Sequence, residues 1–326
     1  MRVSIAIVNW NTRDLLRDCL TSISSPVGSP DLVEIIVVDN ASTDGSADMV
    51  AKSFPNVRLI QNDTNVGFTK GVNQAFLASA GKYFLLLNSD AFQKDDAISR
   101  CARYLDKRPD VAVLGCRLEY PDGSTQSSCF RFTSLRGIIL TALYLSQTFK
   151  HSYYLNWDRY GCFEWDDPRE VDCVMGSFMM VRRSIIEGNA LLDSGYFMYG
   201  EEKDLCFRLR RRGYKTIFYP HAIVVHHHFG SSSKSDIAAW VYEMKRRATL
   251  RFLWKWRGKG VGWLANLLMT VGLLPRILAW AVGDFLAVAR GRGTFPEQLL
   301  KLRVLRFHLA AMFHTSLFAS EWGPDK

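Results

Sequence analysis

Residues 83–90, YFLLLNSD, decide the fold class of this chain. The apolar run is continuous rather than alternating, which is typical of a strand buried on both faces of a parallel sheet. It ends in three polar residues, Asn88, Ser89 and Asp90. Open α/β sheets bind ligands at the carboxyl ends of their strands. The stretch therefore predicts a buried strand whose tip lies at a ligand site.

Similar apolar runs occur before and after this strand, and helical stretches separate them. They are VSIAIVN (3–9), EIIVVD (34–39), VRLIQN (57–62) and VAVLG (111–115). Continuous apolar strands that alternate with helices indicate a sheet covered on both faces. We expect an α/β fold with a doubly wound, mostly parallel sheet. In VMGSFMMVRRS (174–184), a further predicted strand, Gly176 is expected to mark a close approach of two backbones.

Charge separates the chain into two parts. The net charge is +9, and residues 234–326 carry all of this excess, with 15 Lys and Arg against 6 Asp and Glu. Residues 1–233 are neutral overall, so we expect one domain there, with halves of about 1–115 and 116–233. Residues 234–326 form a basic, apolar helical extension.

Several common chemistries are excluded by missing motifs. The chain has no GxGxxG after its first strand, no GxxxxGK[ST], no HExxH and no GxSxG, which argues against dinucleotide binding, P-loop ATP chemistry and two hydrolase classes. Its seven cysteines are scattered without a CxxC pair, which favours a reduced, cytosolic compartment.

An acidic cluster begins the segment FMYGEEKDLCFRLRRRGY (197–214). Glu201, Glu202 and Asp204 stand where an apolar stretch meets a cationic helix. Carboxylates in the first turn of a helix interact favourably with its dipole, so simple helix stabilisation is one interpretation. A general base for catalysis is the other.

Polar residues at three strand ends also allow two interpretations. Asp39 and Asn40 can bind a nucleoside or form a turn, and Asp90 can bind a metal–diphosphate or cap a helix. His226, after the run AIVV, can ligate a metal or form an ordinary hydrogen bond.

Together these segments resemble family 2 glycosyltransferases of the rhamnosyltransferase-like branch. The similar strings, in the family's order over about residues 3–233, are VSIAIVNWNTRDLLRDCLTSI, VVDNASTDGS, NVGFTKGVNQAF, YFLLLNSD, VDCVMGSFMMVRRS, YFMYGEEKDLCFRLRRRGY and FYPHAIVVHHHFGSS. The resemblance implies a GT-A fold for residues 1–233, a nucleotide-sugar donor, Mg²⁺ or Mn²⁺ as cofactor, and inversion at the anomeric carbon.

The resemblance also implies roles for individual residues. The donor-binding residues are Asn9, Asp39, Asn40, Asn65, Gly67, Gly71, Asn73, Ser89 and Asp90; the acceptor-side residues are Asp172, Gly176 and Ser177. Asp90 and His226 match the metal site. Glu202 stands where the family usually has an Asp as base, so Glu201 remains an alternative base, with Asp204 as a third acid of the site.

The implied function is transfer of a sugar to a lipid-linked or polysaccharide acceptor of the cell envelope. L-rhamnose from dTDP-rhamnose is the first expectation for the donor, and a UDP-hexose or UDP-N-acetylhexosamine is the alternative. A catalytically silent scaffold that only binds nucleotide sugar is an alternative of another class. Nucleic acid is not an expected partner, because the basic tail is rich in aromatic and aliphatic residues.

The extension 234–326 is expected to attach the protein to an anionic membrane surface. Its cations accompany Trp240, Trp254, Trp256, Trp263 and Trp280, and Trp favours the headgroup layer. The uncharged run 260–275 is shorter than the roughly 20 residues that a spanning helix needs. We expect a peripheral or monotopic protein on the cytoplasmic face, with a spanning helix or a merely soluble tail as alternatives.

Overall fold

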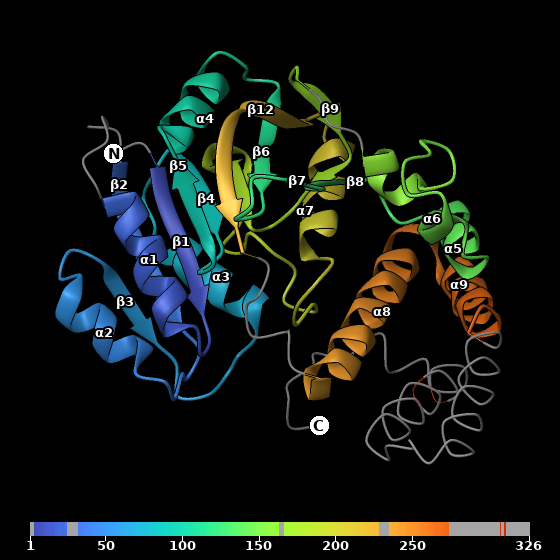
Figure 1. The fold of residues 1–326 in the computed structure, drawn as a ribbon, viewed down its shortest axis with the longest axis horizontal. Coiled ribbons are helices and arrows are strands. Elements are labelled where there is room, and N and C mark those ends of the chain that lie inside the picture. The colour runs from blue at the N-terminus through green and yellow to red at the C-terminus, as the bar shows by residue number, and fades with distance from the viewer. Residues whose placement is uncertain are drawn as a thin grey trace. The chain divides into compact units, whose positions relative to one another are not determined.

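The computed structural model describes residues 3–24, 32–162, 166–227 and 235–273, with Phe307 and Ala310. These residues form two compact units, drawn in Figure 1. The first unit holds residues 3–132 and 166–227. The second joins 133–162 to the C-terminal helices, whereas the sequence pattern places 133–162 in the acceptor half of the first domain.

The N-terminal half of the first unit has the predicted parallel sheet. Its strands are β1 (Val3–Asn9), β2 (Leu32–Asp39), β3 (Arg58–Gln61) and β4 (Tyr83–Leu87), which lie in the order β3-β2-β1-β4. In the parallel register Asn9 pairs with Asp39, so their side chains meet at one edge of the sheet. The helices of this half are α1 (Arg13–Ser24), α2 (Ser46–Ser53) and α3 (Phe68–Ala78).

The expectation of a mostly parallel sheet is wrong for the other half. Strand β11 (Phe178–Arg182) lies antiparallel between β4 and β6 (Val111–Glu119). Strand β12 (Lys215–His226) is parallel to β6 and antiparallel to β5 (Ala91–Lys94). A strand buried on both faces has the same apolar pattern in either direction, so the sequence could not reveal this reversal.

The pairing of β5 with β12 creates the most informative contact between distant segments. In its register Ala91 lies opposite His226, and the His227 N–H donates to the Asp90 carbonyl at 3.0 Å. Asp90 and His226 therefore become neighbours.

Helices cover the sheet, and the core between them is mainly aliphatic, with a few large aromatic side chains. Helix α3 packs on β1 and β2, and α4 (Ala97–Asp106) on β6 and β12. Helix α7 (Glu201–Arg211), labelled in Figure 1, packs against β10 and β12. Tyr83, Phe84 and Phe178 are fully buried. The smaller elements are β7 (Thr125–Gln126), β8 (Cys129–Phe130), β9 (Arg169–Val171), β10 (Cys173–Val174) and the 3₁₀ turn η2 (Arg183–Ile185).

The second unit is helical. It contains α5 (Leu135–Ala142), α6 (Leu145–Thr148), η1 (Trp157–Cys162), α8 (Ser235–Arg257) and α9 (Lys259–Val271). Helix α9 packs against both α8 and α5. Phe252 of α8 is buried, and the neighbouring buried guanidinium of Arg246 donates to the Asn266 carbonyl at 3.3 Å.

The apolar run 260–275 lies mainly in the thirteen-residue helix α9. None of the helices in the described ranges is both long and apolar enough to cross a membrane. Of the tryptophans expected at a headgroup layer, Trp263 is exposed, whereas Trp240, Trp254 and Trp256 are half-buried. Trp280 lies outside the described residues.

Candidate active site

The tips of β1 and β2 form one polar cluster. The Asn9 amide donates to Asp39 Oδ2 at 2.9 Å, and Asn9 Oδ1 accepts from the Thr12 hydroxyl at 2.6 Å. Asp39 Oδ1 accepts the Ser42 N–H at 2.8 Å, a contact that stabilises the turn after β2. A carboxylate offers about four acceptor positions. Asp39 therefore retains capacity for a ligand hydroxyl or amine.

Asn40 connects this cluster to the start of α3. Its amide donates to the Gly67 carbonyl at 3.2 Å and accepts from the Asn62 amide at 2.8 Å. Asn65 Oδ1 accepts the Gly67 N–H at 3.0 Å. These contacts hold Asn40, Asn65 and Gly67 together as a floor beside the strand tips, called the donor floor below because the sequence predicts donor binding there.

Gly71 and Asn73, which were also expected to bind the donor, face the protein interior. A Cβ on Gly71 would lie 3.1 Å from the Val8 side chain, so this glycine lets α3 pack closely on β1. The Asn73 amide bonds to the backbone of Leu192 rather than standing open at the surface.

Asp90 and His226 form a buried pair. His226 Nε2 lies 3.2 Å from Asp90 Oδ1, and His226 Nδ1 lies 2.7 Å from Gln126 Oε1. The Gln126 oxygen can only accept, so Nδ1 carries a proton. Nε2, the other ring nitrogen, faces Asp90 Oδ1, so an imidazole nitrogen and a carboxylate oxygen converge on one point.

This donor set fits a divalent cation that is also held by a ligand. Mg²⁺ prefers one or two carboxylates completed by phosphate oxygens and water, and imidazole is a ligand for the later transition metals. Gln126 has the role of an outer partner that orients a ligating histidine. Within the described ranges, no group of three or more His, Cys, Asp or Glu residues could hold a metal. Asp90 and His226 therefore need further ligands from substrate or water.

Ser89 lies beside this pair. Its hydroxyl is 2.8 Å from that of Thr12, which ties the end of β4 to the start of α1.

The acids of α7 occupy three different environments. Glu201 is 5% exposed, and burial, with the charge of Glu202 as a second cause, raises its pKa well above the ordinary value. Glu202 is half-buried. Asp204 is fully buried and pairs with Arg208 Nε at 3.1 Å. Burial disfavours charge on Glu201, and Glu202 is the more accessible carboxyl group of the two.

The expected acceptor-side residues have different surroundings. Asp172 Oδ2 accepts the Phe132 N–H at 2.9 Å, and Oδ1 pairs with Arg210. The Ser177 carbonyl accepts the Asn88 N–H at 3.1 Å, which places Ser177 next to the Asp90 turn. The expectation of a close approach at Gly176 is wrong, because a Cβ there would make only an ordinary 3.7 Å contact with Leu86.

Sequence reasoning missed Gln126, Leu192 and Trp10. Gln126 lies on a two-residue strand, and Leu192 participates through its backbone, so neither has a sequence signal. Trp10 has one, because it directly follows Asn9 at the tip of β1. Its ring is 39% exposed, and an exposed aromatic face can stack on a nucleobase.

Comparison with known proteins agrees with these features. The family model described as "Glycosyl transferase family 2" matches residues 4–188. The "N-acetylglucosaminyl-diphospho-decaprenol L-rhamnosyltransferase" of Mycobacterium tuberculosis is 28% identical over 245 residues, which cover 71% of this chain and 77% of that protein. "Rhamnosyltransferase WbbL" of Escherichia coli K12 is 29% identical over 188 residues, which cover 56% of this chain and 65% of that protein.

Solved structures agree in fold. The mannosyltransferase PcManGT from Pyrobaculum calidifontis, in complex with GDP-Man and Mn²⁺, has a TM-score of 0.55 at 18% identity and covers 95% of this chain and 85% of its own. Residues 1–349 of S. aureus TarS give 0.51 at 14% identity, covering 96% and 81%. At such low identity the likeness concerns the fold, and it supports the expected GT-A type of α/β architecture.

Proposed function

The chain belongs to glycosyl transferase family 2, and from that premise we propose that it transfers L-rhamnose from dTDP-L-rhamnose to a lipid-linked sugar of the cell envelope, with inversion. The observation that carries the proposal is the buried Asp90–His226 pair, oriented by Gln126. A diphosphate leaving group needs such a site. The names of two similar proteins support the choice of rhamnose, and one of them also names a polyprenol-linked acceptor.

The donor lies with its nucleoside on Asp39 and Asn40 and its base against Trp10. Its diphosphate lies toward Asp90 and His226. Asp90 and His226 would hold a divalent cation there, and the cation would neutralise the charge that develops on the departing diphosphate. The buried surroundings of both residues exclude water, which strengthens this electrostatic stabilisation.

Glu202 is the base of the proposed reaction. Its carboxylate takes the proton of the acceptor hydroxyl, whose oxygen attacks the anomeric carbon from the face opposite the leaving group. The new glycosidic bond forms as the bond to the diphosphate oxygen breaks, and the electron pair leaves with dTDP. Glu201 is the weaker candidate because burial raises its pKa and disfavours its charged form.

A panel of donors tests the proposal. Purified protein is mixed with N-acetylglucosaminyl-diphospho-decaprenol, Mg²⁺ or Mn²⁺, and dTDP-L-rhamnose, UDP-glucose or UDP-N-acetylglucosamine. We expect a deoxyhexose mass increase of the lipid with dTDP-L-rhamnose. Transfer from a UDP-sugar alone would refute the donor assignment. Donor binding without any transfer or donor hydrolysis would favour the silent scaffold.

Attachment to an anionic membrane belongs to the same proposal, because a polyprenol-linked acceptor resides in a bilayer. The second unit has a concentration of exposed apolar side chains: Ile139, Leu143, Phe149, Tyr153, Tyr154, Trp263, Leu264 and Val271. Exposed Lys255, Arg257 and Lys259 lie where α8 meets α9. Each such cation contributes about 1 kcal/mol near an anionic surface.

Vesicle sedimentation tests the membrane claim. The full chain should pellet with vesicles of phosphatidylglycerol and phosphatidylethanolamine and remain in solution with phosphatidylcholine. Leu143→Ser should weaken binding, whereas Leu77→Ser is the matched control, since Leu77 is equally exposed in the first unit. Equal binding to both vesicle types, or equal loss in both variants, would contradict this assignment.

A further inference from the structure

Helix α3 is bonded to the loop that leads into the catalytic helix α7. The Asn73 amide donates to the Leu192 carbonyl at 2.9 Å, and its oxygen accepts the Leu192 N–H at 2.9 Å. A third bond joins Asn73 Nδ2 to the Ser194 hydroxyl at 3.3 Å. Asn73 is only 8% exposed. Its side chain is therefore fully engaged with a segment 119 residues away in the sequence.

A second contact joins the same loop to the first turn of α3. The Phe197 carbonyl accepts the Phe68 N–H at 2.9 Å and thereby caps the helix. Gly67, at φ 89°, lies under the Phe197 ring, where a Cβ would come within 2.7 Å of the ring. Residues 192–197 are thus held to α3 at both ends, at Leu192 by Asn73 and at Phe197 by Phe68.

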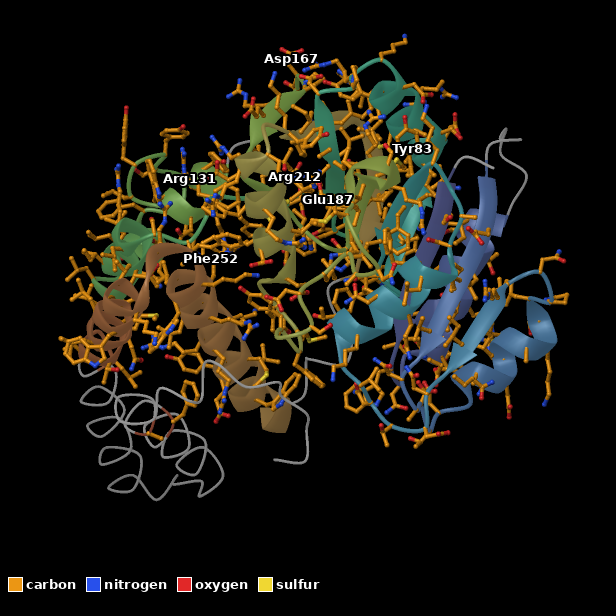
Figure 2. The ribbon with its side chains drawn as sticks, turned by 180° about the vertical axis from the view of Figure 1, so that it is seen from behind. Tyr83, Arg131, Asp167, Glu187, Arg212 and Phe252 are labelled. Atoms are coloured by element: carbon orange, nitrogen blue, oxygen red, sulfur yellow. The ribbon has the colours of Figure 1, made fainter. Side chains whose placement is uncertain are left out.

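Helix α7 holds the loop from its other side. Arg208 Nη2 donates to the Leu191 carbonyl at 2.6 Å, while its Nε pairs with Asp204. Just beyond the helix, Arg212 pairs with Glu187 at 2.7 Å and donates to the Ile185 carbonyl; Figure 2 labels both partners of this pair. Asp204 therefore serves to orient Arg208.

Three residues, Met198, Tyr199 and Gly200, separate this anchored loop from the glutamate pair. Tyr199 has a φ of 69° and Gly200 a φ of 82°. A non-glycine residue in the left-handed region is strained, and it persists only where its surroundings enforce it. The contacts at Leu192 and Phe197 fix the chain that enters this strained turn.

We propose that Asn73 is a positioning residue for the transfer reaction: by holding Leu192 and its loop to α3, it sets the place of Glu202 relative to the donor floor. This inference rests on the proposed function, in which Glu202 is the base. The start of α3 is itself hydrogen-bonded to the nucleoside side, because the Asn40 amide donates to the Gly67 carbonyl. Hydrogen bonds therefore connect the nucleoside side, through Gly67 and α3, to the loop that precedes the glutamate pair.

The size of the effect follows from the geometry. Displacement of a reacting group by about 1 Å can cost about 100-fold in rate. We therefore expect Asn73→Ala to lower kcat by about 10- to 100-fold. The affinity for dTDP with Mn²⁺ should stay unchanged, because Asn73 faces the loop and not the strand tips.

The control is Ser79→Ala, at the other end of α3. Ser79 is also buried and hydrogen-bonded, to the Phe76 carbonyl and to Arg183, but it does not touch residues 191–200. Loss of stability alone would affect both variants alike. Asn73→Asp keeps an acceptor for the Leu192 N–H but turns a second oxygen toward the Leu192 carbonyl, so it should loosen the loop at least as much as Asn73→Ala.

Two measurements on the full chain decide the proposal. Hydrogen exchange should be faster at Leu192 and Phe68 in Asn73→Ala, and as slow as in the wild type in Ser79→Ala. Steady-state kinetics with dTDP-L-rhamnose should show the kcat loss in Asn73→Ala only. Unchanged exchange, unchanged kcat, or a loss of dTDP affinity equal to the loss of kcat would each overturn it. A wild type inactive with every donor in the panel would instead refute the proposed function, and exchange would still decide whether Asn73 holds the loop.

Discussion

Replacing Glu201 by Gln isolates the cost of burying an ionisable group at the start of α7. Burial and the charge of Glu202 raise the pKa of Glu201 well above its ordinary value of 4.5. A raised pKa in the folded state means that stability is fully present below the unfolded-state pKa and is lost as the pH rises through the folded-state pKa. The wild type should therefore lose stability with rising pH, starting near pH 4.5.

The magnitude follows from proton linkage. Inside this window one bound proton separates the folded and unfolded states, so the free energy of unfolding falls by at most about 1.4 kcal/mol per pH unit. Gln does not titrate, so the free energy of unfolding of the Glu201→Gln variant lacks this slope. For a domain of this size, 1 kcal/mol corresponds to about 2–4 °C in Tm. The Tm of Glu201→Gln relative to wild type should therefore rise by up to about 3–6 °C per pH unit.

Scanning fluorimetry from about pH 5 to about pH 8 measures this difference. The matched control is Glu187→Gln, because Glu187 is a largely exposed carboxylate that also pairs with an arginine. The control should follow the pH dependence of the wild type. If Glu201→Gln also runs parallel to the wild type across this range, Glu201 is charged in the folded protein, and the assignment of the base to Glu202 loses its physical reason.

Three further predictions concern catalysis and the metal. Glu202→Gln should lower turnover by about 10²- to 10⁴-fold while dTDP still binds; a loss in Glu201→Gln instead, measured in the same assay, would reverse the two roles. Asp90→Ala should abolish transfer and weaken Mn²⁺-dependent binding of dTDP in calorimetry, and near-wild-type turnover would remove Asp90 from the site. Gln126→Leu should weaken the apparent Mn²⁺ affinity by about 10- to 100-fold, because the His226 ring loses its orienting partner; an unchanged metal titration would show that this contact only supports packing.

Much of the site was predictable because its residues lie at the ends of apolar strands. A strand that is buried along its length and ends in polar residues brings those residues to one edge of the sheet. This pattern predicted Asp39, Asn40 and Asp90, and the parallel register confirms that Asn9 and Asp39 meet. The roles of these residues toward donor and metal stay predictions.

Other parts depended on contacts that no local pattern encodes. The antiparallel direction of β11 was missed because a continuous apolar run has the same pattern in either chain direction. Gln126 lies on a two-residue strand, and its partner His226 is 100 residues away in the sequence. The acid at 204 looked like a member of the site, but burial next to Arg208 makes it part of the support for the loop.

The amino-acid sequence by itself determined the strands, the polar tips and the family, because hydrophobic periodicity and short motifs are local properties. It also separated a neutral body from a basic, apolar extension. Only the tertiary structure decided which tips face one another, which of two adjacent glutamates is buried, and how α3 holds the loop before Glu202. These outcomes depend on the register of strands far apart in the chain and on the solvent exposure of individual side chains, and both are set when the whole sheet assembles.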